Sequence, residues 1–171
     1  MKRVLALLTA ALAAPAFAQT PPPAKQPPKP CTSPESRQFD FWIGDWEVFQ
    51  PDGKKAGTNR IDAVYGCVLH ENWKGNGGFE GQSFNRWDAQ RGVWHQTWID
   101  STGTILMLEG AFKDGVMTLS DTTLPGKKDP KRVNEIAWSK NADGSVRQLW
   151  RVSADGGATW TTAFDGKYVK K

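Results

Sequence analysis

Uncharged or acidic polar residues alternate with tryptophans along three consecutive segments of this chain, 67–74, 80–88 and 93–100. Tryptophan is costly to leave in water, so the face that carries these side chains is expected to point inward. A buried polar group that lacks a partner costs about 1–3 kcal/mol. The polar residues of this face therefore need one another, trapped water or a ligand. The face comprises Glu71, Trp73, Ser83, Asn85, Trp87, Gln96 and Trp98, and a later segment adds Gln148 and Trp150.

Two arrangements satisfy this pattern. The first is an amphipathic cavity that holds a small, partly apolar molecule between flat aromatic walls, with a few groups that orient it by hydrogen bonds. The second is a solid interior that the tryptophans fill, with the polar groups paired to one another. We expect the cavity, with Trp73, Trp87 and Trp98 in contact with the ligand. Its orienting groups would be Glu71, Asn85 and Gln96.

Signals for catalysis, metal binding and cofactors are weak. The chain has no Gly-x-Ser-x-Gly motif and no phosphate-binding loop, and its two histidines, His70 and His95, fall on the opposite face. Glu71 and Asp100 would form an acid/base pair only if they met across the interior. We therefore expect no metal and no cofactor, and a binding protein more than an enzyme. An enzyme that uses inward carboxylates and a structural or partner-binding domain of the envelope are the alternatives.

The chain from residue 45 onward consists of short alternating segments separated by turn residues. This regular spacing of alternating segments and turns is typical of antiparallel hairpins, and no segment has the pattern of a long helix. It predicts an all-β, up-and-down antiparallel barrel of eight to ten strands, with a two-sheet sandwich as the alternative. The expected strands are 45–50, 58–65, 67–74, 80–88, 93–100, 104–112, 115–121, 132–140, 145–153 and 159–169.

An aromatic segment precedes the first strand and fits a short helical turn packed against a core. Its apolar members are Phe39, Phe41, Trp42 and Ile43. Ser33 suits the cap of such a turn, and Pro34 suits its first position. Gly44 then permits a sharp bend into a strand in which Trp46 and Val48 share one face. We expect this segment to close one end of the barrel.

The same residues carry a resemblance. Gly44-Asp45-Trp46 resembles the Gly-x-Trp signature with which lipocalins and their calycin relatives begin the barrel. The string FDFWIGDW, together with Gly66-Cys67 and the GlyGlyAlaThrTrp run, is similar to a domain of unknown function of bacterial secreted proteins. The resemblance implies a lipocalin-like barrel over residues 39–171 and favours a ligand cavity. True lipocalins differ in having a Thr-Asp-Tyr motif, and an arginine where this chain offers Lys167, Lys170 and Lys171.

The first residues have the features of a secretory signal peptide. Lys2 and Arg3 precede an apolar run too short to span a bilayer, and small residues predict cleavage after Ala18. Residues 19–38 follow as a proline-rich spacer, with six prolines in the twelve positions 19–30. The sequence thus predicts a periplasmic or secreted protein without stable membrane insertion.

The charges argue against binding to nucleic acid. The whole chain has 22 basic and 18 acidic residues, but five of the bases and one acid precede residue 39, which leaves 17 of each in the barrel. A nucleic-acid-binding face needs a local excess of lysine and arginine. The expected partner is a small molecule, and the sequence names no protein partner.

Cys31 and Cys67 are the only cysteines. In an exported protein such a pair is expected to form a disulfide, which would fasten the N-terminal segment to the barrel. Two unpaired thiols are the alternative.

The stretch from Ser153 to Trp160 matches the Ser-x-Asp-x-Gly-x-Thr-Trp box that caps hairpins in sialidase-like propellers. Propellers repeat such a box in blade after blade, whereas this chain has one copy. We expect Asp155 and Trp160 to stabilise a hairpin. A carbohydrate-active protein is the less favoured interpretation.

Overall fold

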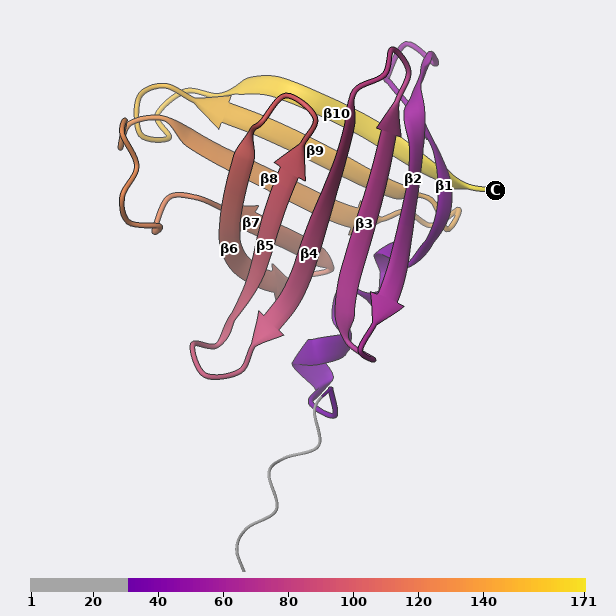
Figure 1. The fold of residues 1–171 in the computed structure, drawn as a ribbon, viewed down its shortest axis with the longest axis horizontal. Helices are drawn as coiled ribbons and strands as arrows, with labels where there is room; N and C mark the ends of the chain where they lie inside the picture. The colour runs from indigo at the N-terminus through magenta and orange to yellow at the C-terminus, as the bar shows by residue number, and fades with distance from the viewer. Residues whose placement is uncertain (1–30) are drawn as a thin grey trace, which may run out of the picture.

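Ten antiparallel strands form the barrel. The structure, a computed structural model, describes residues 31–171. Each strand is hydrogen-bonded to the next along the chain, and β1 also pairs with β10, so the sheet closes (Figure 1). The strands are β1 (Gly44–Phe49), β2 (Lys55–Val64), β3 (Val68–Gly75), β4 (Glu80–Asp88), β5 (Val93–Asp100), β6 (Ile105–Lys113), β7 (Val116–Ser120), β8 (Val133–Lys140), β9 (Val146–Ser153) and β10 (Thr161–Lys170).

The up-and-down barrel predicted from the alternation is confirmed, at the upper limit of the expected strand number. The pair that closes it joins Trp46 of β1 to Lys170 of β10. The sandwich alternative is wrong, because a sandwich would leave β1 and β10 as separate edges. Strands β2–β6 form one wall, and β8–β10 cross behind them at a steep angle (Figure 1). Closure leaves no exposed strand edge in this sheet.

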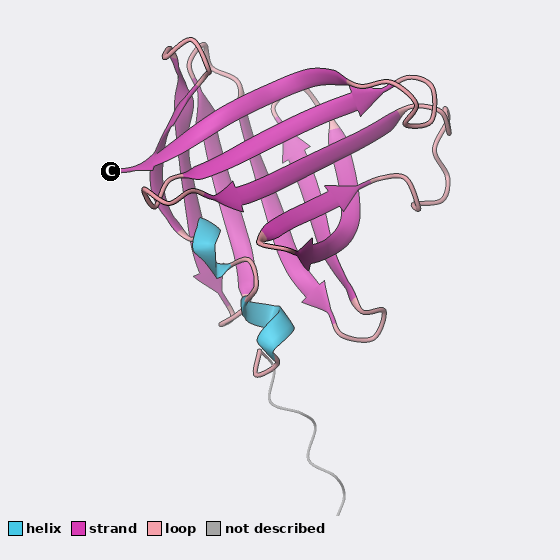
Figure 2. Cartoon of the chain, turned by 180° about the vertical axis from the view of Figure 1, so that it is seen from behind, coloured by secondary structure: helices cyan, strands magenta, loops and turns pink. Residues whose placement is uncertain are grey.

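Two short 3-10 helices close one end of the barrel, as predicted (Figure 2). They are η1 (Pro34–Arg37), in which Ser33 accepts a hydrogen bond from the Ser36 amide, and η2 (Asp40–Trp42). Phe39 and Trp42 are fully buried and stack with ring centroids 5.0 Å apart. We call this the plugged end. The opposite, open end carries the turns between β1 and β2, β3 and β4, and β5 and β6.

Trp46 joins the plug to the barrel wall. Its side chain is fully buried, and its indole Nε1 donates to the carbonyl of Trp42 at 2.9 Å. Gly44, with φ of +148°, makes the bend between plug and strand. The Lys170 ammonium lies 5.4 Å from the centroid of the Trp46 ring. A lysine on the closing strand therefore covers the tryptophan here.

The predicted disulfide is confirmed. Cys31 and Cys67 are bonded, and they fasten the chain before η1 to the turn between β2 and β3. The Arg37 guanidinium donates to the carbonyl of Gly66 in the same turn at 2.7 Å. Residues 31–38, which the sequence assigns to the end of the spacer, thus contact the barrel. The expected signal peptide and the rest of the spacer lie outside the described residues. No helix in residues 31–171 is long and apolar enough to cross a membrane.

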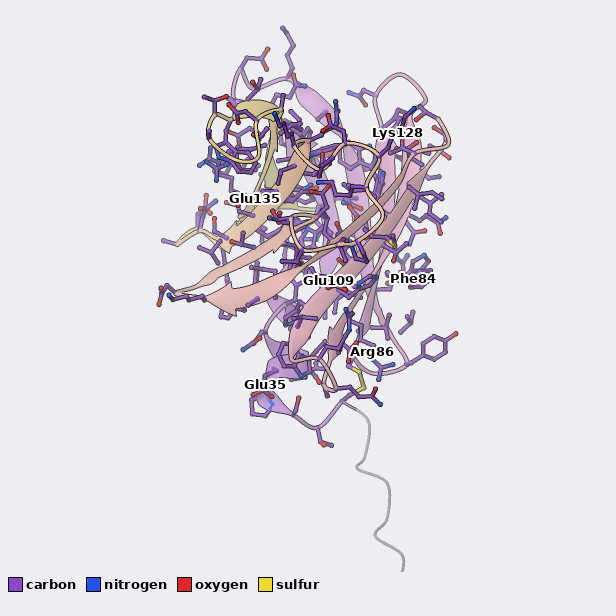
Figure 3. All side chains as sticks on the ribbon, turned by 90° about the vertical axis from the view of Figure 1, so that its left-hand side faces the viewer. Glu35, Phe84, Arg86, Glu109, Lys128 and Glu135 are labelled. Carbon is purple, nitrogen blue, oxygen red and sulfur yellow. A yellow bond between two sulfur atoms is a disulfide. The ribbon has the colours of Figure 1, made fainter. Side chains whose placement is uncertain are left out.

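The outward face of the first wall carries four exposed apolar side chains, each 47–66% exposed. Figure 3 shows Phe84, one of these four, on the outside of the barrel. The Phe84 ring stacks on His70 at 4.5 Å. His70 and His95 both lie on this outward side of the alternation. The four side chains are Phe84, Ile99, Ile105 and Met107.

Candidate functional site

A cavity of about 300 Å³ occupies the barrel toward its open end. Residues at that end, Gln50, Asn76 and Phe79, contribute to its mouth. Deeper down, its lining comes from both walls of the barrel, so the interior is not a completely filled core. The lining comprises Gln50, Ala56, Glu71, Trp73, Gly75, Asn76, Phe79, Gln96, Trp98, Leu106, Ile136, Trp138, Gln148, Trp150, Ala163, Phe164 and Tyr168.

The walls of the cavity are mainly aromatic. Trp73 meets Phe164 edge to face across the barrel, with centroids 5.9 Å apart. Trp98 lies against Gly81 of β4, where an added Cβ would fall 2.2 Å from the ring. Only glycine leaves room for the indole to lie flat on the neighbouring strand at this point. Trp150 is fixed by a hydrogen bond from its Nε1 to Asn134. Because their indoles are held in place, these walls are shaped before any ligand arrives.

A chain of hydrogen bonds forms the floor and crosses six strands. Tyr168 donates to Gln148 Oε1 and lies 3.5 Å from the amide of Asn59. The Asn59 amide donates to Glu71 Oε1 at 2.7 Å. On the other side of Glu71, the Ser83 hydroxyl donates to Oε2 at 2.5 Å. The chain continues through Asn85 to Gln96. The hydrogen bonds therefore link the buried polar residues across the floor, and within residues 31–171 Asn59 Oδ1 is the atom of this chain that stays buried without a partner.

The backbone fixes the direction of this chain. The Asn85 amide nitrogen donates both to the carbonyl of Leu69 and to Ser83 Oγ, so Asn85 Oδ1 must face Gln96. Gln96 accordingly donates its amide to Asn85 at 2.7 Å. Every donor from Gln96 to Ser83 thus points toward Glu71. The Gln96 carbonyl and the Gln148 amide group are not used by this chain, and both residues line the cavity.

Glu71 is the one charged group on this floor. Burial raises its pKa from 4.5 to about 7, against the hydrogen bonds from Ser83 and Asn59 and the nearby His70, which lower it. Burial, followed by the charge of Glu71, raises the pKa of Tyr168 well above its ordinary value. Near neutral pH, Tyr168 is therefore a neutral hydrogen-bonding group, while Glu71 exchanges between its two protonation states.

Replacement of Glu71 by glutamine is expected to remove a pH dependence of stability. The folded protein holds the Glu71 proton more tightly than the unfolded chain, so the free energy of unfolding falls as the pH rises from 4.5 to 7 and then levels off. The difference from this group is about 3 kcal/mol. We expect denaturant unfolding at pH 5 and pH 8 to show this loss in the wild type and not in Glu71→Gln. The exposed Glu80, changed to glutamine, is the matched control; equal slopes in all three proteins would contradict the assignment.

The structure brings together six of the nine residues expected to contact a ligand, at the lining of one cavity. Ser83 and Asn85 are buried in the floor but do not line the cavity. Trp87 also does not line it: Trp87 pairs with Trp94, which packs on Phe39 of the plug. Trp87 therefore lies toward the plugged end. The six lining residues are Glu71, Trp73, Gln96, Trp98, Gln148 and Trp150.

Sequence reasoning missed several residues of the site. Asn59 and Tyr168 complete the hydrogen-bond chain, while Phe79 and Phe164 extend the aromatic lining. Alternation of Tyr168 with Gly166 and Phe164 on one face of the last strand was the available signal. The contact of Tyr168 with Asn59 depends on closure of the barrel, which alternation alone does not reveal.

The site contains one carboxyl group, not two. Asp100 sits at the end of β5, where its Oδ1 accepts hydrogen bonds from the backbone and hydroxyl of Thr102 and its Oδ2 accepts one from Trp98. Burial acts to raise its pKa, but the hydrogen bonds from Thr102 and Trp98 outweigh this and hold it at about 2. Asp100 does not line the cavity. No group of three or more potential metal ligands is found within residues 31–171.

The Asp155 segment forms the turn between β9 and β10. Asp155 accepts hydrogen bonds from the amide and hydroxyl of Thr159 at 2.8 and 2.6 Å, and Ser153 accepts one from the Gly157 amide at 2.8 Å. The hydrogen bonds from Thr159 and Ser153 lower the Asp155 pKa to about 2. Trp160 packs beneath the Arg151 guanidinium at 5.0 Å. These contacts are local to the hairpin.

Comparison of the chain with protein-family models and with curated proteins finds no match.

Proposed function

We propose that this chain is an exported, lipocalin-like protein of the family it resembles in sequence, and that it binds a small, partly apolar molecule inside the barrel. One observation carries the proposal: aromatic walls enclose a cavity of about 300 Å³ above a floor of ordered polar groups. Apolar walls with a few fixed hydrogen-bonding groups are the usual form of a small-molecule site. Stacking on the walls supplies affinity, and the floor selects among similar molecules.

The free groups of two glutamines support this mechanism. The hydrogen-bond chain uses the amide nitrogen of Gln96 and the carbonyl of Gln148, so it leaves the Gln96 carbonyl and the Gln148 amide nitrogen over, and both residues line the cavity. A ligand that bonds to both would be fixed in one orientation without breaking the floor. A core with no ligand would more simply use leucine or valine here, since these residues carry no desolvation cost.

Narrowing the cavity is the direct test. Ala56 lines the cavity from β2, so Ala56→Phe is expected to reduce its volume and abolish binding of any molecule that co-purifies with the wild type. Native mass spectrometry of the protein purified from its own compartment identifies that molecule, and tryptophan quenching measures its affinity. Ala111 is exposed on β6, so Ala111→Phe is the matched control and should bind normally. A ligand that binds equally to both variants lies outside the barrel and contradicts the proposal.

Export makes a separate prediction. The intact mass of the mature protein should lack residues 1–18, because cleavage after Ala18 leaves Gln19 as the first residue. Intact-mass spectrometry of the secreted or periplasmic fraction gives the answer directly. A protein that keeps the first eighteen residues would overturn export while leaving the cavity argument unchanged.

Each of the three alternative functions would depend on a different structural feature. An enzyme with paired inward carboxylates requires a second carboxylate in the cavity, and Glu71 is the single one among the described lining residues. A partner-binding domain would use the outward apolar group around Phe84. A carbohydrate-active protein would draw on the Asp155 turn, whose contacts serve the hairpin itself. Small-molecule binding has the most direct support.

A further inference from the structure

The described lining of the cavity contains an acidic side chain but no basic one to neutralise it. Among the described residues that line the cavity, Glu71 is the single acidic group, and lysine, arginine and histidine are absent. Two other partly buried carboxylates of the barrel do have a cationic neighbour: Asp165 pairs with Arg147 at 2.7 Å, and Glu109 pairs with Arg91 at 2.6 Å. Glu71 is 4% exposed and receives hydrogen bonds from neutral donors alone. A buried carboxylate without a cation is costly, since burial weakens its solvation.

The floor is nevertheless arranged to favour negative charge at Glu71. The amide of Gln96, the amide of Asn85 and the hydroxyl of Ser83 each donate one step closer to it, and the Asn59 amide donates from the other side. Donors aligned in this way stabilise an anion at the end of the chain. These hydrogen bonds thus offset part of the cost of burying a carboxylate at Glu71, and no cation of the described lining offsets the rest.

The aromatic walls of the cavity are favourable surroundings for a cation. Trp73, Trp98 and Trp150 line the cavity from β3, β5 and β9, and Phe79 and Phe164 add two further rings. The faces of aromatic rings attract organic cations, most strongly where water is excluded. The ring centroids of Trp98 and Phe79 lie 6.4 Å apart, and those of Trp73 and Phe164 lie 5.9 Å apart. An organic cation in this cavity would therefore have aromatic rings as well as the Glu71 carboxylate around it.

We infer that the cavity takes a small organic cation, a protonated amine on a compact apolar body, with its ammonium group at Glu71 and its carbon body among the tryptophans. This inference rests on the proposed function and names the chemical class of its ligand. An anion would meet the Glu71 charge and is excluded. A neutral molecule can fill the same space, but it leaves that charge uncompensated.

Binding of a cation should depend on pH through Glu71. The elements around it contribute Asn59 from β2, Ser83 from β4 and Tyr168 from β10, and of these only Tyr168 is ionisable; it stays neutral. His70, the neighbour of Glu71 in sequence, points to the outside and stacks on Phe84. Because Glu71 must be ionised to hold the ammonium, affinity should rise about 100-fold from pH 5 to pH 8. His70→Gln should keep most of this dependence.

Three matched probes test the inference by calorimetry: 2-phenylethylamine, its neutral counterpart 2-phenylethanol, and the anion phenylacetate. We expect the amine to bind at least about tenfold more tightly than the alcohol at pH 8, and phenylacetate not to bind. Glu71→Gln should lower the affinity for the amine by at least about tenfold and change the affinity for the alcohol by no more than about twofold. Glu80→Gln, an exposed change of the same charge, should leave all three unaltered. Circular dichroism of each variant checks that the barrel is folded.

Each other outcome is decisive. If the alcohol binds as tightly as the amine, or if Glu71→Gln leaves amine affinity unchanged, the cavity binds small molecules without using charge: the cation inference fails and the proposed function stands. Affinity that falls as the pH rises would show that Glu71 acts in its protonated form, and would equally overturn the inference. If no probe binds, the cation inference fails. The proposed function is then judged separately by the co-purified ligand and the Ala56→Phe variant.

Discussion

Replacement of Trp46 by alanine is expected to lower the free energy of unfolding by about 3–5 kcal/mol, as truncation of a large core side chain does. Trp46 is fully buried and packs edge to face on Tyr168, with centroids 6.3 Å apart. The change also removes the hydrogen bond to the Trp42 carbonyl and the ring beneath Lys170. Urea unfolding followed by far-ultraviolet circular dichroism measures the loss.

Trp160→Ala is the matched control, because Trp160 is partly exposed and its ring contact is with Arg151 at the surface. We expect it to cost about 1 kcal/mol or less. Equal losses for the two variants would show that the plugged end contributes no more than a surface hairpin. Since Tyr168 also belongs to the floor of the cavity, Trp46→Ala should in addition weaken ligand binding.

The barrel was predictable because strands such as β4 alternate between buried and exposed residues, and most of the strands are separated by short turns. Burial along β4 illustrates this: Gly81, Ser83 and Asn85 are buried, whereas Gln82, Phe84 and Arg86 are exposed. A one-residue shift in pairing would expose the first set, so the pattern specifies both the face and the register. The ends of the strands were less predictable. The expected ends differ from the observed ones by up to three residues, because the turn residues do not specify where strand pairing stops.

The site was predictable only in part, because alternation gives the face of a residue but not its depth along the barrel. Trp87 and Trp98 share the inward face, yet Trp87 lies toward the plug and Trp98 lines the cavity. Asn59 belongs to the floor because of the register in which β2 pairs with β3. Asn59 lies opposite Trp73, which is two residues from Glu71 on the same face of β3. Tyr168 comes close to Asn59 only after β10 closes on β1. Contacts of this kind depend on tertiary closure and leave no local signal.

Removal of the Cys31–Cys67 disulfide is expected to cost about 4 kcal/mol, since its loop of 36 residues restricts the unfolded chain far more than the folded one. The loop includes both helices of the plug and the first two strands. The double variant Cys31→Ser/Cys67→Ser avoids the free thiol that a single change would leave. Urea unfolding of this variant should show a lower midpoint, and a steeper dependence on urea because its unfolded state is more expanded.

Two results separate the effect of the cross-link from that of local contacts. The wild type unfolded in the presence of a reductant should match the double serine variant, because both lack the cross-link and differ little in side-chain volume. Arg37→Ala removes the nearby hydrogen bond to Gly66 and the partly exposed ion pair with Asp40 but keeps the disulfide, so it should cost only about 0.5–1.5 kcal/mol. If the double variant loses no more stability than Arg37→Ala, the N-terminal segment is held by packing of Phe39 and Trp42. In that case the plug would remain seated in the reduced protein, and ligand binding at the open end would be insensitive to the redox state.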